Sequence, residues 1–371
     1  MAIVGCGKIA DSHASQIQRI PGCGIVAVCD NEPLMAQQAC ERFSVPGCFS
    51  DLRELLTTVK PDVVHVTTPP ASHFSIAKLC LESGCHVYVE KPFTLYEEEA
   101  RKLIALADEN GLKITVGHDD QFRHGARRMR ALIQGGYLGD GPMHMESYYG
   151  YELSSDYAAA LLADKQHWVR RLPGKLLQNV ISHGIARIAE YLTSDSPEVM
   201  VCGYTSPFLR AMGETEIIDE LRMIVCEDRR VTAYFTFSSQ MRPALHQFRV
   251  YGSKNGLVLD QDQETVIKLR GSRLKSYAEH FISPAILAKQ QLGNVVTNVR
   301  CFLGNDFHMK SGMKYLIEAF YRSIVEGTPA PISYAEILRT AKIMDCIFAQ
   351  LDEQRSQGQA QSLDLHQPLA R

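Results

Sequence analysis

The first third of the chain alternates short apolar segments with longer amphipathic ones, and this alternation constrains the fold more than any other feature. The short segments are rich in β-branched residues, as expected of strands that are buried on both faces. They cover residues 2–4, 25–29, 63–67, 86–89 and 113–116. Amphipathic helical spacing is found at residues 33–43, 51–58, 72–83 and 96–110. The repetition predicts a doubly wound α/β unit, in which helices cover a parallel sheet.

Beyond the glycines near residue 140 the pattern changes to longer β-rich segments, which predict a second, mostly antiparallel sheet. These segments cover residues 143–150, 199–206, 231–240, 246–251 and 257–269. One helical stripe interrupts them, with Ile181, Ile185, Ile188 and Leu192 at helical spacing. Further helices are expected at residues 122–134, 311–326 and 334–352.

The 371 residues are enough for two domains. We predict an N-terminal Rossmann domain with a doubly wound parallel sheet over residues 1–118. A C-terminal α+β domain with a large, mostly antiparallel sheet is predicted over 119–355, followed by a polar, frayed tail at 356–371. Apolar residues at 274–309 leave two interpretations, a subunit interface and an extension of the core, of which the core is favoured.

Composition excludes several classes of function. A formal net charge of -3 provides no basic surface for nucleic acid, and no long apolar segment predicts insertion in a membrane. The sequence starts directly in an apolar strand, without a basic region or cleavage site, so a cytoplasmic location is expected. The 11 cysteines lack the paired spacing of metal sites, which predicts reduced thiols and no bound metal.

A glycine-rich turn follows the first predicted strand and precedes a helix. It reads Gly5-Cys6-Gly7-Lys8-Ile9-Ala10, the G-x-G-x-x-A form of a dinucleotide-binding turn. Gly5 allows a tight turn, Gly7 lets the backbone approach a pyrophosphate, and Ala10 allows the helix to pack on the strand. The free amides at the helix N-terminus attract phosphate. The turn therefore predicts a dinucleotide site.

Asp30 ends the second strand, where an acid can accept hydrogen bonds from ribose hydroxyls. Its charge would repel a 2′-phosphate, and the next residues, Asn31 and Glu32, offer no arginine to bind one. NAD is therefore predicted as the cofactor, with NADP less favoured.

Two further motifs follow later strands, Thr68-Pro69-Pro70-Ala71-Ser72-His73 and Glu90-Lys91-Pro92. With the turn, they make the chain resemble the glucose-fructose oxidoreductase / inositol dehydrogenase / MocA family (Gfo/Idh/MocA), over roughly residues 3–270 and 311–350. The resemblance implies a nicotinamide-dependent dehydrogenase. The cofactor contacts expected from the turn and the resemblance are Gly5, Gly7, Lys8, Ile9, Ala10, Asp30, Thr68, Pro69, His73, Glu90, Lys91 and Gln121.

The resemblance implies that Lys91 is the cation that polarises the reacting oxygen and that His183 is the general base. His183 follows Asn179 by four residues, so a helix would place both on one face, away from the isoleucine stripe. The family most often has aspartate where this chain has Asn179, and an asparagine can orient the ring but cannot carry the charge. His183 is therefore expected to be the sole base.

Other segments are assigned to the substrate by resemblance. Trp168-Val169-Arg170 matches a W-x-R segment that borders the substrate in the family, although a core position for the tryptophan is an open alternative. Substrate contacts are thus predicted for Lys91, Trp168, Arg170, Asn179 and His183. Residues 117–123 depart from the family's Y-N-x-R-F string through the acidic pair Asp119-Asp120, a departure that can reset substrate preference.

The leading hypothesis is an NAD-dependent dehydrogenase or reductase of a sugar, nucleotide sugar or inositol-like polyol. Two alternatives stay open: a non-catalytic dinucleotide sensor or scaffold, and a lyase- or glycosidase-type enzyme that retains its NAD. By analogy with the family, a homodimer or homotetramer is expected.

Overall fold

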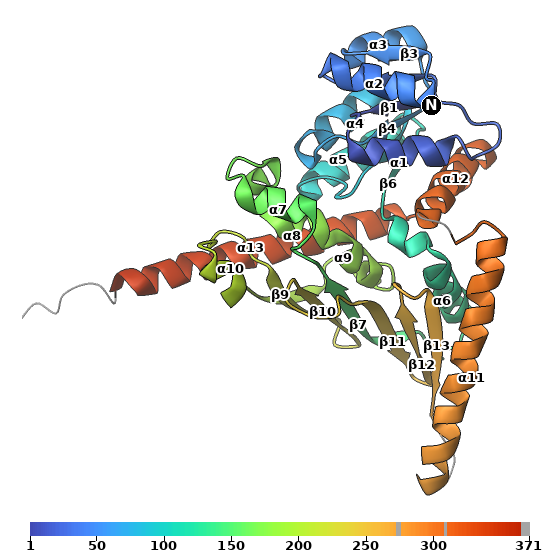
Figure 1. Ribbon diagram of the computed structural model, residues 1–371, viewed down its shortest axis with the longest axis vertical. Helices are drawn as coiled ribbons and strands as arrows, with labels where there is room; N and C mark the ends of the chain where they lie inside the picture. The colour runs from blue at the N-terminus through green and yellow to red at the C-terminus, as the bar shows by residue number, and fades with distance from the viewer. Residues whose placement is uncertain (272–275, 308–309, 365–371) are drawn as a thin grey trace, which may run out of the picture.

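The computed structural model describes residues 1–271, 276–307 and 310–364. In the view of Figure 1 the N-terminal sheet and its helices lie at the top, and the larger C-terminal sheet lies below them. The long helices α11 (Ser276–Leu303) and α13 (Tyr334–Asp364) extend along two sides of the lower part.

The N-terminal sheet contains six parallel strands in the order β3-β2-β1-β4-β5-β6. These are β1 (Ala2–Val4), β2 (Ala27–Cys29), β3 (Gly47–Phe49), β4 (Val63–Val66), β5 (His86–Val89) and β6 (Ile114–Val116). The connecting helices are α1 (Lys8–Ile17), α2 (Pro33–Phe43), α3 (Leu52–Val59), α4 (His73–Glu82) and α5 (Glu97–Glu109). The order reverses between β1 and β4, so a ligand crevice is expected at the carboxyl ends of these strands. The predicted doubly wound sheet is confirmed.

The C-terminal sheet has the strand order β13-β12-β11-β7-β10-β9-β8, and every neighbouring pair is antiparallel except β7 and β10. The strands are β7 (Pro142–Gly150), β8 (Glu198–Tyr204), β9 (Glu220–Glu227), β10 (Val231–Ser238), β11 (His246–Gly252), β12 (Asn255–Asp260) and β13 (Thr265–Arg270). A mostly antiparallel second sheet is therefore also confirmed.

Short helices connect the two sheets and cover the second one. They are α6 (His124–Gln134), α7 (Asp156–Ala163), α8 (Lys175–Val180), α9 (Ser182–Ala189), α10 (Pro207–Ala211), and the 3₁₀ turns η2 (Asp119–Phe122) and η3 (Trp168–Arg171). The 3₁₀ turn η1 (Pro70–Ser72) instead lies between β4 and α4. The predicted isoleucine stripe is buried, and α9 packs directly on β10: a Cβ on Gly184 would come 2.4 Å from the Phe235 ring. The close approach of α9 to the sheet therefore requires a glycine at this position.

Helix α12 (Ser311–Glu326) returns to the N-terminal sheet, where Leu316, Ile317 and Phe320 are part of the hydrophobic core. Helix α13 then joins both cores, with Ile337 in the first and Ile347 in the second. The chain therefore crosses between the two sheets three times, after β6, before α12 and along α13, and the division of domains at residue 118 stays a prediction.

Some elements differ from the predictions. Strands β3 and β9 were not predicted, because β3 is a three-residue edge strand and β9 carries charged residues among its apolar ones. The single segment 257–269 forms two strands, β12 and β13, that pair as a hairpin. Helix α13 continues to Asp364, into the segment predicted as a frayed tail, and residues 365–371 lie outside the described part of the chain.

The apolar segment at 274–309 forms α11, and the favoured interpretation as a core extension is wrong for most of its apolar side chains. Phe281 is 77% exposed, Phe302 67% and Leu303 75%. Among the residues of this helix whose burial is described, Asn294 is the buried one, and its amide donates to the Val266 oxygen of β13. Burial cannot be inferred here from apolar composition, because only one side of α11 meets the sheet.

No helix among the described residues combines the length and the hydropathy needed to cross a membrane.

Candidate active site

The glycine turn lies between β1 and α1, at the carboxyl edge of the N-terminal sheet. Gly5 has φ +94°, and a Cβ there would come 2.7 Å from the Thr68 Cγ2 atom. Around Gly7, by contrast, a Cβ would meet no atom within 4 Å. Gly7 caps α1 with no side chain in the way, so the amides of the first helical turn are accessible to an anion. These residues fit the pyrophosphate of a dinucleotide.

Asp30 closes the other side of this turn. Its carboxylate accepts hydrogen bonds from the backbone N–H groups of Cys6, at 2.7 Å, and Glu32, at 2.9 Å. The carboxylate is thus fixed beside the glycine turn, with lone pairs left over for a diol. Asp30 therefore fits a ribose that carries free hydroxyls.

Glu90, at the end of β5, starts a buried chain of hydrogen bonds. His13 Nε2 lies 2.8 Å from Glu90 Oε1, His13 Nδ1 lies 2.8 Å from His65 Nδ1, and His65 Nε2 lies 2.6 Å from the Tyr321 hydroxyl. Burial raises the pKa of Glu90, but the hydrogen bond and charge of His13 outweigh it and hold that pKa at about 2. Because ionised Glu90 only accepts, His13 Nε2 donates to it. The chain thus holds the corner before Lys91 to α1, β4 and α12.

Lys91 follows Glu90 and precedes a cis peptide bond to Pro92. Its Nζ donates to the backbone oxygen of Asn179, at 2.8 Å, so the ammonium bridges the N-terminal sheet and α8. Burial lowers the pKa of Lys91, while the charge of Glu90 opposes that shift. The structure therefore brings Lys91 and Asn179 together, as predicted, but through the backbone of Asn179.

His183 lies on α9, whereas Asn179 lies on α8, so the two do not share one uninterrupted helix. His183 is only 9% exposed, so its side chain is buried and not solvated. Its Nδ1 lies 3.7 Å from Asp120 Oδ2, and its ring meets the His118 ring edge to face at 5.8 Å. Among the described residues, this Nδ1 has no hydrogen-bond partner.

Burial shapes the charge states around His183. It lowers the pKa of His183 to about 4, against the opposing charge of Asp120, so the imidazole is neutral near pH 7. Burial and repulsion from Asp120 raise the pKa of Asp119 to about 7. Burial also raises the pKa of Asp120, but the charges of His183, Arg187 and Arg123 prevail and hold it at about 2. The site therefore combines a neutral imidazole, an ionised carboxylate and a carboxyl that titrates near neutrality.

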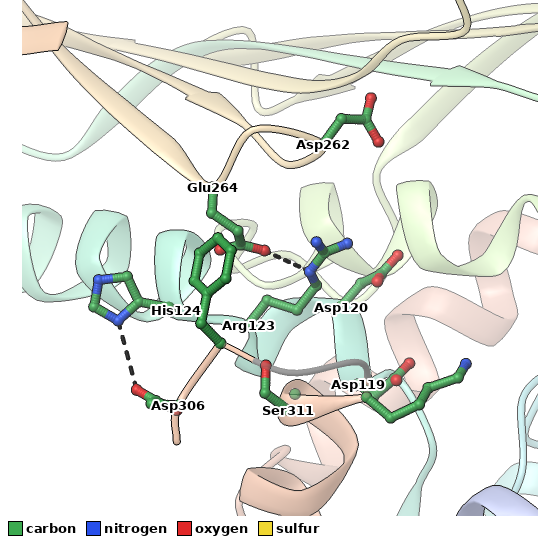
Figure 2. Close-up of a pocket in the computed structure, with 11 residues that line it drawn as sticks. Asp119, Asp120, Arg123, His124, Asp262, Glu264, Asp306 and Ser311 are labelled. Atoms are coloured by element: carbon green, nitrogen blue, oxygen red, sulfur yellow. Dashed lines mark ion pairs between the residues drawn. The ribbon is translucent and has the colours of Figure 1, made fainter. Parts of the chain in front are cut away.

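Asp119 and Asp120 also line a polar cavity of about 340 Å³. Figure 2 shows acidic side chains around it, from η2, from the β12–β13 connection and from the segment before α12. Its polar lining is Asp119, Asp120, Arg123, His124, Asp262, Glu264, Asp306, Lys310 and Ser311. Arg123 is paired with Glu264, whereas Lys310 has no ion pair among the described residues. The cavity is thus rich in hydrogen-bond acceptors.

Two groups among the described residues have the geometry to hold a metal ion, although the sequence predicts none. They are His124, Cys301 and Asp306, and Asp119, Asp120 and His183. In the first group Asp306 is already engaged by two hydrogen bonds from Arg127. The absence of a metal stays a prediction.

The comparisons with known proteins agree with this architecture. Residues 1–118 match the model of the Gfo/Idh/MocA oxidoreductase family with an NAD-binding Rossmann fold. The N-terminal domain is thus similar to the Rossmann domain of this family. D-glucoside 3-dehydrogenase of Escherichia coli K12 is 33% identical over 141 residues, 38% of this chain and 40% of that protein. UDP-N-acetylglucosamine 3-dehydrogenase of Acidithiobacillus ferrooxidans is 34% identical over 118 residues, 31% of this chain and 36% of that protein.

The chain thus matches about two fifths or less of the length of these relatives. The likeness in fold extends much further. The WlbA dehydrogenase of Bordetella pertussis, solved with NADH and UDP-GlcNAcA, has a TM-score of 0.73 at 16% identity, covering 95% of both chains. The likeness in fold therefore includes the second sheet, and the match of residues 1–118 supports the resemblance inferred from the motifs.

Two residues of the predicted cofactor set are bound to other parts of the protein. His73 is fully buried, and its ring nitrogens lie 2.9 Å from the Pro92 oxygen and 2.8 Å from the Thr68 oxygen. It holds two family motifs together. The Gln121 amide, 2% exposed, donates to Glu190 and Glu336. The positions of these two side chains therefore do not support a direct contact with the cofactor, which stays a prediction.

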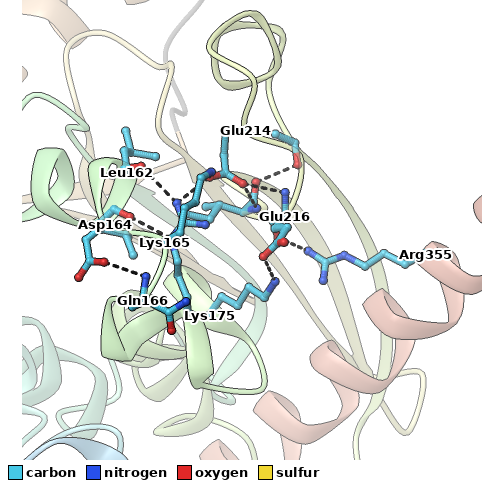
Figure 3. A network of polar contacts seen from close by, with 12 residues as sticks. Leu162, Asp164, Lys165, Gln166, Lys175, Glu214, Glu216 and Arg355 are labelled. Atoms are coloured by element: carbon cyan, nitrogen blue, oxygen red, sulfur yellow. Dashed lines mark hydrogen bonds and ion pairs between the residues drawn. The ribbon is translucent and has the colours of Figure 1, made fainter.

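Trp168 and Arg170 lie on η3, and the structure does not group them with Lys91. Trp168 packs against the second core, which is the alternative left open above. The Arg170 guanidinium donates to Glu214, at 2.7 Å, and to the Leu161 oxygen, at 3.0 Å, and the residue is only 8% exposed. Figure 3 shows the surrounding network, in which Lys165 also pairs with Glu214. Arg170 and Glu214 therefore both bind other parts of the protein.

Asp119 and Asp120 are the functional candidates that the sequence did not single out as site residues. The acidic pair marked a departure from the family string, but its position beside His183 depends on how η2 meets α9. Sequence spacing predicts that a carboxylate lies next to a histidine only when both residues belong to the same helix or strand.

Stability should fall as the pH is lowered, because four buried histidines have a lowered pKa through burial, His65, His73, His118 and His183. Below about pH 6.5 the unfolded chain binds protons at these sites and the folded chain does not. Asp119 and Glu336 oppose this trend, since their pKa is raised to about 7 and the folded chain takes up their protons first. Because the histidines are more numerous, the unfolded chain binds more protons than the folded chain as the pH falls. The free energy of unfolding should then decrease by ~1.4 kcal/mol per pH unit for each additional proton bound.

Urea denaturation between pH 7.5 and 5 tests this expectation. The free energy of unfolding should decrease toward pH 5, and His118→Gln should make the decrease shallower. A flat profile, or one that rises toward pH 5, would show that the two carboxyls dominate.

Proposed function

We propose that the protein is an NAD-dependent oxidoreductase that interconverts a secondary alcohol and a ketone on a sugar- or inositol-like polyol. The observation that carries the proposal is the position of Lys91, whose ammonium bridges the dinucleotide domain and the helix pair α8–α9 that carries His183. The family match and the dehydrogenases among the relatives support it.

In this proposal Lys91 and His183 have different catalytic roles. A bound nicotinamide would accept or donate the hydride. Lys91 binds the reacting oxygen and stabilises the negative charge that develops on it. His183, neutral near pH 7, takes the hydroxyl proton, which requires the free lone pair of one ring nitrogen.

The lining of the cavity supports an uncharged polyol as the substrate. Asp119 and Asp262 offer carboxylate oxygens that can accept hydrogen bonds from adjacent hydroxyls. The pairing of Arg123 with Glu264 leaves little positive charge for a diphosphate. A free sugar, glycoside or inositol is therefore favoured over a nucleotide sugar.

Reduction of NAD measured with panels of free sugars, glycosides, inositols and nucleotide sugars tests the function. Activity with a neutral polyol is expected, and activity restricted to nucleotide sugars would refute the substrate class. A flat result across all panels would favour a dinucleotide sensor. Turnover of substrate with no net NADH and no exchange of cofactor with the solution would favour an enzyme that retains its NAD.

Asp30 should determine the preference for NAD. Replacing it with serine removes the charge that would repel a 2′-phosphate, so the ratio of kcat/KM for NAD to that for NADP should fall roughly tenfold or more. Asp11→Asn, which removes a nearby surface charge paired with Arg42, is the matched control and should leave the ratio unchanged. An unchanged ratio in the Asp30 variant would contradict its assignment to the ribose.

We also propose that the protein is a homodimer or homotetramer. Exposed apolar side chains on the sheet, among them Met200, Ile224 and Tyr234, and along α11 are consistent with contacts between copies. Light scattering of the purified protein would decide, and a monomer at micromolar concentration would contradict this expectation.

A further inference from the structure

We propose that Asp120 is the carboxylate partner of His183, and that it supplies from η2 the negative charge that Asn179 cannot supply from α8. Asp120 would act as a positioning residue. Its carboxylate accepts a hydrogen bond from the Nδ1–H group of His183, which leaves the Nε2 lone pair to act as the base. This role deepens the proposed function, but the contact itself can be tested without turnover.

The geometry of the pair is the first support. His183 Nδ1 and Asp120 Oδ2 are 3.7 Å apart, and a shift of about one ångström would close this gap to a direct hydrogen bond. The Nδ1 atom is buried and has no hydrogen-bond partner among the described residues. A buried ring nitrogen without a partner is costly, so the adjacent carboxylate is its natural acceptor.

The arrangement also determines the tautomer of the ring. An ionised carboxylate only accepts hydrogen bonds, so a neutral His183 that faces it with Nδ1 must carry its proton there. Nε2 is then an acceptor, as a general base requires. Asn179 cannot substitute for this charge, because its side chain is an uncharged amide and its backbone oxygen already binds Lys91.

The surroundings keep Asp120 ionised in the presence of a second carboxyl. Arg187, on the same helix as His183, and Arg123, which follows η2, both favour the charged form of Asp120. The proton of the acidic pair is therefore taken up by Asp119, whose pKa is raised. The groups that act on His183 from the neighbouring elements are Glu90, Lys91, His118, Asp119, Asp120, Arg187 and Lys310.

The tautomer provides a direct test. In histidine-labelled protein, nitrogen NMR at pH 7.5 should show His183 protonated at Nδ1 in the parental protein, assigned by comparison with His183→Asn. Asp120→Asn should raise the fraction protonated at Nε2 or mix the two tautomers. Asp262→Asn is the matched control, since Asp262 lines the same cavity but binds His246 at 2.8 Å, and it should leave His183 unchanged.

Two outcomes of this measurement would overturn the proposal. One is an unchanged His183 tautomer in a folded Asp120→Asn protein. The other is a change in the His183 signals of the parental protein when a chelator is added, because it would show that Asp119, Asp120 and His183 hold a metal ion instead.

A kinetic measurement then tests the role in catalysis. Asp120→Asn should lower kcat by ~10-fold or more with little change in KM, and it should move the acid limb of the pH profile to lower pH, because loss of the anion makes His183 a weaker base. Adding Asn179→Asp to that variant should restore part of kcat. An equal loss of kcat without a shift of the profile or rescue would indicate a merely structural role. If the parental protein turns over no polyol, the proposed function fails, and the NMR result still decides the contact.

Discussion

Lys91→Met should lower kcat by ~10²–10⁴-fold while the protein stays folded and retains its affinity for NAD. The methionine keeps most of the length and apolar surface of the side chain but removes the charge that faces the Asn179 oxygen. Glu90 should remain ionised, because His13 holds it independently of Lys91. The loss should therefore appear in the chemical step.

Steady-state kinetics with the best polyol of the panel, together with NAD titration by fluorescence, measures this effect. Lys102→Met removes an exposed lysine paired with Glu98 and is the matched control, expected to behave as the parental protein. His183→Ala should produce a loss of similar size. If folded Lys91→Met and His183→Ala proteins both keep near-parental turnover, the catalytic assignment is wrong.

Arg170→Met should destabilise the fold by ~3–5 kcal/mol, the usual cost of removing one partner from a buried ion pair. The side chains of Arg170 and Glu214 are each 5% exposed, and Glu214 also accepts from the backbone of Glu216. Without the guanidinium, Glu214 would retain Lys165, whose side chain is 64% exposed, as a weakly held counter-charge.

Chemical denaturation of Arg170→Met measures the loss, with Arg171→Met as the matched control because Arg171 is exposed and binds only the Gln166 oxygen among the described residues. The control should change stability by less than ~0.5 kcal/mol. A variant that keeps its stability but shows a much higher KM would reinstate Arg170 as a substrate ligand, as the W-x-R motif predicts.

The strand-end motifs made the N-terminal fold predictable because each depends on local chemistry. The turn at Gly5 needs a residue that adopts positive φ, and Asp30 and Glu90 come directly after apolar strands whose burial is evident from composition. Parallel strands bring their carboxyl ends to one edge, so positions in the sequence translate into proximity in space. The same reasoning could not detect β9, in which charged residues obscure the alternation of the strand.

The sequence by itself predicted the dinucleotide domain, the resemblance to the family and a site formed by Lys91 with Asn179 and His183. Only the tertiary structure decided which carboxylate faces His183, that Arg170 serves the fold, and that the apolar side chains of α11 are exposed. These features depend on how η2, α9 and η3 pack against elements far away in the chain. Local pattern records the propensity of a segment and the chemistry of its residues, whereas the partner of a side chain is set by long-range packing.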